Sequence, residues 1–132
     1  MIGLDTNVLV RHLVDGDSPT QRAAVEELLA QATPKDPAYV SLVTVIETVW
    51  VLRQGYKYPA AQVLGFVAQL LRAPEIVVED AELLISALSD ATSKGVDLAD
   101  AVIARSGTRA RCATTYTFDR KAAGLVVSSR DS

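Results

Sequence analysis

The sequence predicts an α/β fold in which a parallel β-sheet is covered on both faces by helices. Short apolar segments of strand length alternate with longer helical segments, and this alternation is typical of parallel sheets. The chain has 132 residues, the length of one domain, and shows no internal repeat or linker. With 49% hydrophobic residues it can bury a core without disulfides, and its single cysteine has no partner within the chain. We therefore expect one domain over residues 1–132.

Each predicted strand is a short apolar run bounded by polar or turn-forming residues. In chain order, the strands cover residues 1–5, 38–40, 75–78, 112–118 and 125–127. The segment 38–55 is rich in Val, Ile and Thr, which favour strands, but it is too long for one strand. We therefore assign only its first three residues to a strand and the rest to a helix.

The predicted helices show apolar residues at helical spacing and capping residues at their ends. They cover residues 6–14, 18–32, 42–55, 58–73, 79–95 and 97–110, and residues 119–123 form one further turn. Ser18 and Ser41 are the expected N-caps of the second and third helices, and Pro19 suits a first helical position. Gly55 and Gly95 close the third and fifth helices, because glycine readily adopts the left-handed conformation found at helix C-termini.

The charge is distributed unevenly along the chain, although the net charge is only −3. Residues 1–93 carry 12 acidic and 6 basic side chains, whereas residues 94–132 carry 4 acidic and 7 basic ones. A locally positive surface attracts phosphates, although a mixed, solvated surface explains the same counts. No segment has the ~18 uncharged apolar residues of a membrane-spanning helix, and the N-terminal segment lacks the features of a signal peptide. We expect a cytoplasmic protein that does not contact a membrane.

Two aspartates directly follow predicted strands and are candidate site residues. Asp5 follows the first strand, and Asp119 follows the strand over 112–118. Ligands of open parallel sheets bind outside the carboxyl ends of the strands, so both carboxylates are expected at that edge. Each also has an ordinary structural explanation, because Asp5 or Asn7, and likewise Asp119, can cap the helical segment that follows.

Two predicted helices carry the other candidate carboxylates. Glu47 lies in a mostly apolar helix, where a buried, unpaired charge is costly, so it requires a cation or an exposed helix edge. Asp97 and Asp100 are three residues apart, on neighbouring positions of one helix face. Asp97 is also the expected N-cap, which places Asp100 in the first turn, where the helix dipole favours an acid.

If Asp5, Glu47, Asp100 and Asp119 converge, the carboxylates repel one another strongly or trap protons unless a divalent cation neutralises them. A donor set made only of oxygen atoms suits Mg²⁺ or Mn²⁺ better than Zn²⁺. Such a site can lower the pKa of a bound water and hold the oxygens of a phosphodiester during attack. The reaction class predicted from these residues is metal-assisted phosphodiester hydrolysis.

Other catalytic arrangements have little support in the sequence. His12 is the only histidine and is expected to be a partly exposed helix residue, and Cys112 is expected to be a small core residue. There is no phosphate-binding glycine loop and no dinucleotide-binding motif. A phosphatase of the haloacid dehalogenase type also begins with a strand and an aspartate, but Asn7 stands where its general acid would be.

Four segments together resemble the PIN-domain family, and in particular the VapC-type ribonuclease toxins of bacterial toxin-antitoxin pairs. They are "LDTNVLVRHLV", "SLVTVIETVWVL", "DLADAVIA" and "TTYTFDRKAA", and they follow the order and spacing of the family over nearly the whole chain. The resemblance implies a three-layer α/β/α sandwich around the parallel sheet. It also implies an endoribonuclease that depends on Mg²⁺ or Mn²⁺.

The resemblance assigns a role to each motif residue. The four catalytic acids correspond to Asp5, Glu47, Asp100 and Asp119, and the principal metal ligands among them are Asp5 and Asp100. Auxiliary roles fall to Thr6, Asn7, Asp97 and Thr117. Thr6 and Asn7 would brace the turn of the first acid, as outer-shell groups orient a ligand. Asp97 would act as an outer-shell acid, and Thr117 would place a hydroxyl beside the fourth acid.

The resemblance also implies partners. These are an RNA substrate, a cognate antitoxin protein that holds the toxin inactive, and a second copy of the chain in a homodimer. The apolar helical segments 41–52 and 60–71 are candidate antitoxin contacts, although core packing accounts for most of their residues. The alternative function is a non-catalytic PIN-like module that binds RNA or a protein.

Overall fold

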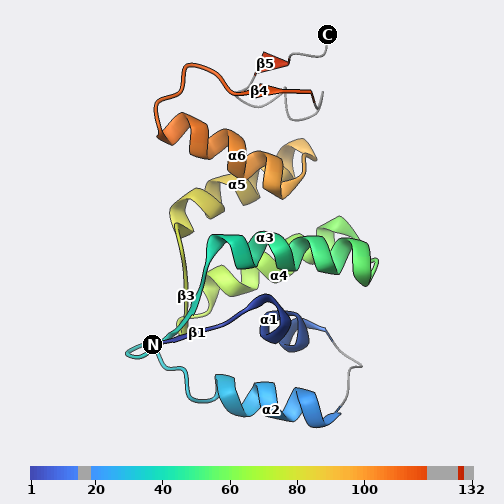
Figure 1. Ribbon diagram of the computed structural model, residues 1–132, viewed down its shortest axis with the longest axis vertical. Helices are drawn as coiled ribbons and strands as arrows, with labels where there is room; N and C mark the ends of the chain where they lie inside the picture. The colour runs from blue at the N-terminus through green and yellow to red at the C-terminus, as the bar shows by residue number, and fades with distance from the viewer. Residues whose placement is uncertain (15–18, 119–127, 130–132) are drawn as a thin grey trace. The chain divides into compact units, whose positions relative to one another are not determined.

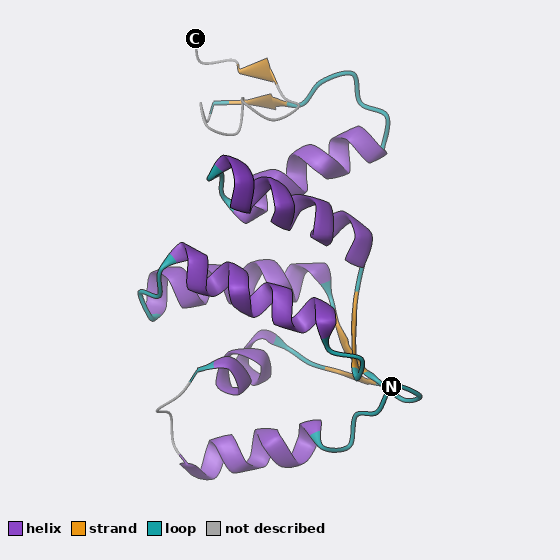
Figure 2. Ribbon diagram, turned by 180° about the vertical axis from the view of Figure 1, so that it is seen from behind, coloured by secondary structure: helices purple, strands orange, loops and turns teal. Residues whose placement is uncertain are grey.

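The computed structural model describes residues 1–14, 19–118 and 128–129. The chain divides into two compact units, residues 1–81 and residues 82–132. Figure 1 follows the chain by residue number, and Figure 2 shows the same elements from behind. No helix in the described part of the chain is long and apolar enough to cross a membrane.

The first unit contains a parallel three-stranded sheet. Its strands, in the order in which they pair, are β1 (Ile2–Gly3), β2 (Ala38–Val40) and β3 (Ile76–Val78). Every connection between them is helical, as Figure 2 shows. The connecting elements are α1 (Thr6–Leu13), α2 (Pro19–Leu29), α3 (Leu42–Trp50), η1 (Val51–Gly55) and α4 (Ala60–Arg72). Parallel strands joined by helices confirm the predicted α/β class.

The helices α3 and α4 form a hairpin, since they lie side by side in both views and are joined through η1 (Figures 1 and 2). Beneath it, one buried apolar cluster joins the hairpin to α1 through Val10, Val14, Leu52 and Val63. Each such side chain contributes about 1.5–3 kcal/mol when it is fully buried. The hairpin is therefore anchored by the core of the first unit.

The start of α3 is held by two side chains. Ser41 Oγ accepts a hydrogen bond from the backbone N–H of Thr44 at 3.1 Å, which confirms the predicted N-cap. Glu79 Oε1 accepts a second bond from the N–H of Leu42 at 2.8 Å. Burial, together with the charges of Glu79 and Asp80, raises the pKa of Tyr39 in β2.

The second unit contains two helices and a short two-stranded sheet. Its elements are α5 (Ala81–Lys94), α6 (Leu98–Arg109), β4 (Tyr116–Thr117) and β5 (Ser128–Ser129), and the two strands are parallel. Gly95 ends α5 with φ +67°, and its N–H donates to the carbonyl of Ala91 at 3.1 Å, as predicted for a glycine C-cap.

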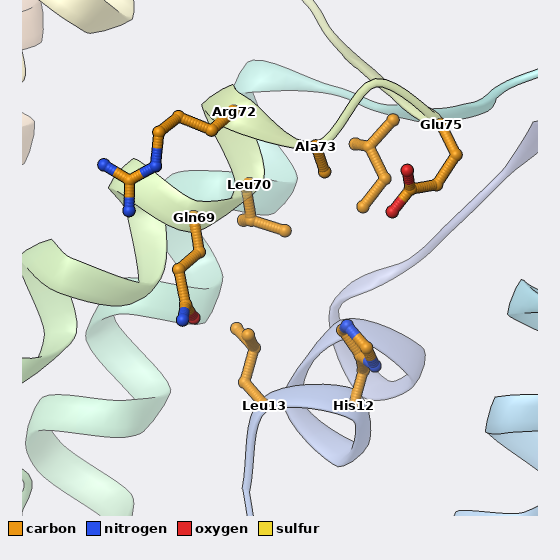
Figure 3. Close-up of a pocket in the computed structure, with 8 residues that line it drawn as sticks. His12, Leu13, Gln69, Leu70, Arg72, Ala73 and Glu75 are labelled. Atoms are coloured by element: carbon orange, nitrogen blue, oxygen red, sulfur yellow. The ribbon is translucent and has the colours of Figure 1, made fainter. Parts of the chain in front are cut away.

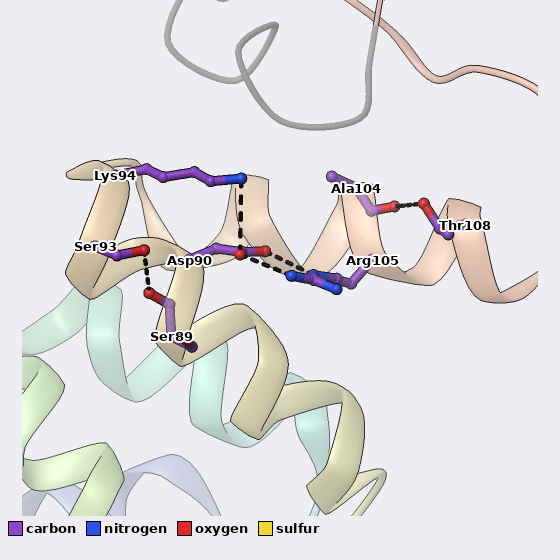
Figure 4. Close-up of polar contacts among 7 residues, drawn as sticks. All are labelled: Ser89, Asp90, Ser93, Lys94, Ala104, Arg105 and Thr108. Atoms are coloured by element: carbon purple, nitrogen blue, oxygen red, sulfur yellow. Dashed lines mark hydrogen bonds and ion pairs between the residues drawn. The ribbon is translucent and has the colours of Figure 1, made fainter.

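An ion pair links α5 to α6. Arg105 donates from Nε to Asp90 Oδ2 at 2.7 Å and from Nη2 to Asp90 Oδ1 at 2.8 Å, and Lys94 lies 3.9 Å from Oδ1 (Figure 4). The side chain of Asp90 is only 8% exposed. The bonds from Arg105 hold the pKa of Asp90 below its ordinary value. Because the contact is bidentate, it fixes the orientation of α6 against α5.

The loop that follows α6 passes close to the helix. The N–H of Cys112 donates to the carbonyl of Gly107 at 2.9 Å. A Cβ atom on Gly107 would lie 2.5 Å from Thr115 Oγ1, closer than real Cβ atoms approach. Glycine at this position therefore allows the loop to approach α6.

Several local expectations need correction. The strand predicted over residues 112–118 is confined to Tyr116–Thr117, and the helix predicted over 42–55 changes to π-helical geometry after Trp50. The prediction that Cys112 is a core residue is wrong, since it is exposed in the loop after α6. The predicted cap Ser18 and the predicted strand over 125–127 lie outside the described residues.

Candidate functional site

Asp5 lies just beyond β1 and is the N-cap of α1. Its Oδ1 accepts a hydrogen bond from the N–H of Val8 at 3.0 Å, so the capping explanation raised from the sequence holds. The residue is exposed, and Oδ2 has no hydrogen-bond donor among the residues that the structure describes. Capping therefore fixes the carboxylate while one of its oxygens remains available to a ligand.

Thr6, the first residue of α1, joins this turn to α3. Its Oγ1 donates a hydrogen bond to Glu47 Oε1 at 3.1 Å. Glu47 is exposed, which matches the exposed helix edge considered for it from the sequence. Thr6 thus links the turn that carries Asp5 to Glu47, although 42 positions separate the two acids in the chain.

The second unit carries the other described acids on α6. Asp97 is the N-cap, and its Oδ1 accepts from the N–H groups of Ala99 at 2.9 Å and Asp100 at 3.3 Å. Asp100 lies in the first turn and is half-buried. The positive end of the helix dipole favours a carboxylate at both positions.

The remaining predicted site residues are placed as follows. Thr117 lies in β4 and is half-buried, and Asn7 is an exposed residue in the first turn of α1. The hydroxyl of Thr6 supports Glu47 and not the carboxylate of Asp5. Asp119 lies outside the described residues. In the first unit, Thr6 links the turn of Asp5 to Glu47, and in the second unit Asp97 accepts from the N–H of Asp100.

The chemistry of these donors fits a hard divalent cation. Asp5, Glu47 and Asp100 offer carboxylate oxygens, which are the ligands that Mg²⁺ and Mn²⁺ prefer. Within residues 1–14, 19–118 and 128–129, however, no three acidic, histidine or cysteine side chains are close enough together to hold a metal ion. The donor type therefore agrees with the predicted cofactor, and the described residues do not by themselves assemble a complete metal site.

The first unit also has a cavity of about 380 Å³. It is lined by the last residues of α1, the C-terminal end of α4 and the residues that begin β3, including His12, Leu13, Gln69, Leu70 and Glu75 (Figure 3). Asp5 caps the opposite end of α1. Neither Asp5 nor Glu47 lines this cavity.

His12 borders this cavity as a half-buried helix residue, as the sequence predicted. Its Nδ1 lies 3.4 Å from Glu26 Oε1, so it contacts one carboxylate from α2. Glu75 lines the cavity as well. At this distance, and with both side chains partly in solvent, the contact contributes little to stability.

The sequence did not point to Glu79 as a residue near the candidate site. Glu79 follows β3, and its carboxylate accepts from the N–H of Leu42 at the start of α3. It therefore helps to place the helix that carries Glu47. The only signal for Glu79 in the sequence is its position directly after a predicted strand. Its hydrogen-bond partner, Leu42, is 37 residues away, so no local pattern could have indicated the contact.

Comparison with known proteins identifies the family. The family model for the PIN domain matches residues 2–125. The chain belongs to the PIN domain family. Its fold class is accordingly the three-layer α/β/α sandwich with a parallel central sheet that the sequence predicted.

A solved structure similar to this PIN domain is the toxin VapC20 of Mycobacterium tuberculosis, described as a toxin that cleaves the Sarcin-Ricin loop. The two chains are 22% identical over 96% of this chain and 97% of the other, with a TM-score of 0.47. No curated protein matches the sequence of this PIN domain.

Proposed function

We propose that this PIN domain is an endoribonuclease and the toxin of a toxin-antitoxin pair. The observation that carries the proposal is the hydrogen bond to Glu47 from Thr6, the residue that follows Asp5, in a PIN domain where both acids are exposed. The catalytic acids of the proposal are Asp5, Glu47, Asp100 and Asp119, and the supporting residues are Thr6, Asn7, Asp97 and Thr117. The whole chain, residues 1–132, works as one domain in this proposal.

The proposed cofactor is Mg²⁺, with Mn²⁺ as an alternative, and its ligands would be Asp5 and Asp100. When bound, the cation would lower the pKa of an attacking water and offset negative charge on the phosphodiester. The chain itself contributes two fixed carboxylates. The N-cap bond from Val8 orients Asp5, and the hydroxyl of Thr6 orients Glu47.

The proposal includes an antitoxin partner, a homodimer and a cytoplasmic location. Apolar side chains that remain exposed support protein partners, since large exposed apolar groups often mark interfaces. They include Val43 (67% exposed), Ile85 (53%) and Ile103 (57%). Covering them with a partner would remove apolar surface from water.

The alternative is a non-catalytic PIN domain that binds RNA or a protein. It is favoured by one observation, namely that Asp5 and Asp97 are both N-caps. A fold can retain these two acids for helix stability alone, because N-cap residues typically stabilise a helix by about 1 kcal/mol.

The two functions are separated by a cleavage assay with the purified full chain. Total bacterial RNA is incubated with Mg²⁺, Mn²⁺ or a chelator, and new 5′ ends are mapped by sequencing. Asp100→Asn serves as the test variant, and Glu27→Gln, an exposed acid on α2, serves as the control. Metal-dependent cuts that Asp100→Asn lacks and Glu27→Gln retains would establish the endoribonuclease. Absence of cleavage together with absence of Mn²⁺ binding would favour the binding module.

A further inference from the structure

Four exposed residues at the turn between α3 and α4 form a surface that we call the hairpin tip. They are Trp50, at the end of α3, Arg53, in η1, and Tyr56 and Lys57, in the turn that follows. Trp50 is 65% exposed and Tyr56 is 41% exposed. Two large aromatic side chains in water cost free energy, so their exposure points to a ligand that covers them.

The ring of Tyr56 is held on a rigid support. It stacks on Tyr58 with ring centroids 6.1 Å apart and planes 11° apart. Tyr58 in turn meets the edge of Phe66 at 6.0 Å and 73°, and both of these rings pack against the buried cluster of the first unit. One face of the Tyr56 ring is thus fixed against the protein, and a flat ligand can stack on the exposed part without first ordering the side chain.

The cation of Arg53 is also fixed in place. Its Nη1 donates to the carbonyl of Tyr58 at 2.8 Å, across the turn. The other guanidinium nitrogens have no acceptor among the described residues, and the side chain is exposed. An arginine held in this way presents its remaining donors to an anion at little entropic cost.

The charge around the hairpin tip differs from that of the rest of the chain. The net charge is −3, yet residues 48–74 contain no Asp or Glu and do contain Arg53, Lys57 and Arg72. The hairpin tip therefore has two cations beside two aromatic rings, and the first acid before it in the chain is Glu47, in α3. Surfaces that combine cations with exposed aromatic rings bind single-stranded nucleic acids, because phosphates pair with the cations and bases stack on the rings.

We propose that the hairpin tip binds a single-stranded segment of RNA next to the bond that is cleaved. Bases would stack on Trp50 and Tyr56, and phosphates would pair with Arg53 and Lys57. This inference rests on the proposed ribonuclease function. A duplex is disfavoured because its bases are already stacked on one another and cannot lie on protein rings.

The position of Trp50 links the hairpin tip to the candidate site. Trp50 is three residues after Glu47 on the same helix, and residues at this spacing are neighbours on the helix surface. A strand held by Trp50 would therefore pass beside the carboxylate of Glu47.

The chain offers a direct readout, because Trp50 is its only tryptophan. The full-length protein is titrated with a single-stranded oligoadenylate in chelator, and both tryptophan fluorescence and the anisotropy of a dye on the RNA are followed. Stacking on Trp50 is expected to quench its fluorescence as the anisotropy rises. Tyr56→Ala is expected to weaken binding roughly 5- to 100-fold, the range for loss of one stacked base. Lys57→Gln is expected to lower the slope of log K against log salt by about one.

Matched variants separate the hairpin tip from the remaining surface. Val77→Ala removes an exposed apolar group from β3 of the same unit, and Lys35→Gln removes an exposed lysine from that unit. Neither is expected to change RNA binding. A duplex of the same length is expected to bind more weakly than the single strand.

The inference would be overturned by RNA that binds without quenching Trp50, by unchanged binding in Tyr56→Ala, or by equal binding of the duplex. It would also be overturned if Trp50→Ala abolished self-association in sedimentation experiments and left RNA binding intact, because the hairpin tip would then be a protein interface. The ribonuclease proposal is tested independently by the cleavage assay. If the protein cleaves RNA but the hairpin-tip variants bind RNA normally, only this inference is refuted. If RNA quenches Trp50 but the protein cleaves no RNA, only the proposed function is refuted.

Discussion

The hydroxyl of Thr6 donates a hydrogen bond to Glu47 Oε1 at 3.1 Å, across 41 positions of sequence. This contact connects the turn after β1 to the middle of α3, and it is the only described side-chain bond between α1 and Glu47. Thr6 thereby orients a carboxylate that is otherwise free to rotate in solvent. The same turn fixes Asp5 through its N-cap bond.

Replacement of Thr6 by valine tests this contact, since valine keeps the shape and removes the donor. We expect RNA cleavage by Thr6→Val to fall roughly 2- to 10-fold, corresponding to one lost hydrogen bond of about 0.5–1.5 kcal/mol. Thr6→Ser keeps the hydroxyl and is expected to retain most of the activity. Equal rates for Thr6→Val and the unchanged protein, measured by initial rates on one RNA, would contradict the orienting role.

The role of Asp97 as the N-cap of α6 can be separated by mutation from any role in RNA cleavage. Asp97→Ala removes the N-cap of α6 and is expected to lower the free energy of unfolding by about 0.5–2 kcal/mol. Asp97→Asn retains a capping oxygen and is expected to unfold like the unchanged protein in urea. If Asp97→Asn nevertheless cleaves RNA more slowly, the charge contributes to activity, and equal rates would restrict Asp97 to capping.

The ion pair between Asp90 and Arg105 predicts a pH dependence of stability. Arg105 lowers the pKa of Asp90 in the folded protein, so its contribution is present above the unfolded pKa of about 3.9 and is lost as the pH falls through the lower folded value. Arg105→Gln is expected to reduce the free energy of unfolding at pH 7 by about 1.5–3 kcal/mol. Its stability is also expected to fall less steeply below pH 5.

Arg105→Lys is the matched control, because it keeps the charge and loses the two-point contact. We expect its stability to lie between that of the unchanged protein and that of Arg105→Gln. Urea unfolding from pH 7 to pH 3 measures all three proteins. Identical pH profiles for the unchanged protein and Arg105→Gln would show that Asp90 titrates independently of Arg105.

The close approach of Thr115 to α6 makes Gly107 sensitive to substitution. Gly107→Ala gains about 1 kcal/mol of helix propensity, but its methyl group would overlap Thr115 Oγ1, and overpacking typically costs about 1–3 kcal/mol. We expect a net loss of stability in thermal unfolding. In a Thr115→Ala background the same change is expected to be neutral or stabilising. Destabilisation of the same size in both backgrounds would mean that Thr115 is not the obstacle.

Local chemistry allowed much of the fold to be predicted from the sequence. Ser41, Asp97 and Gly95 sit at helix ends in the roles expected for them, because caps depend on a few adjacent residues. The three strands of the first unit also lie where the short apolar runs predicted them, although β1 is shorter than expected. The predicted family is confirmed by the family-model match over residues 2–125.

Contacts between distant residues could not be predicted in this way. Nothing near Thr6 indicates that its hydroxyl would reach Glu47, and nothing near Glu79 indicates that it would bond the N–H of Leu42. The exposure of Cys112 likewise depends on where the loop after α6 runs. The convergence of Asp5 and Asp100 remains a prediction, since each is positioned within its own unit.

The exposed position of Cys112 has a practical consequence. The chain has one tryptophan and one cysteine, and they lie in different units, Trp50 in the first and Cys112 in the second. A thiol-reactive acceptor dye on Cys112 would receive excitation energy from Trp50 without any engineered substitution. Energy transfer between these two natural positions would therefore measure the separation of the two units in solution. Repeating the measurement with RNA, with the unlabelled protein as the reference for direct quenching of Trp50, would show whether substrate draws them together.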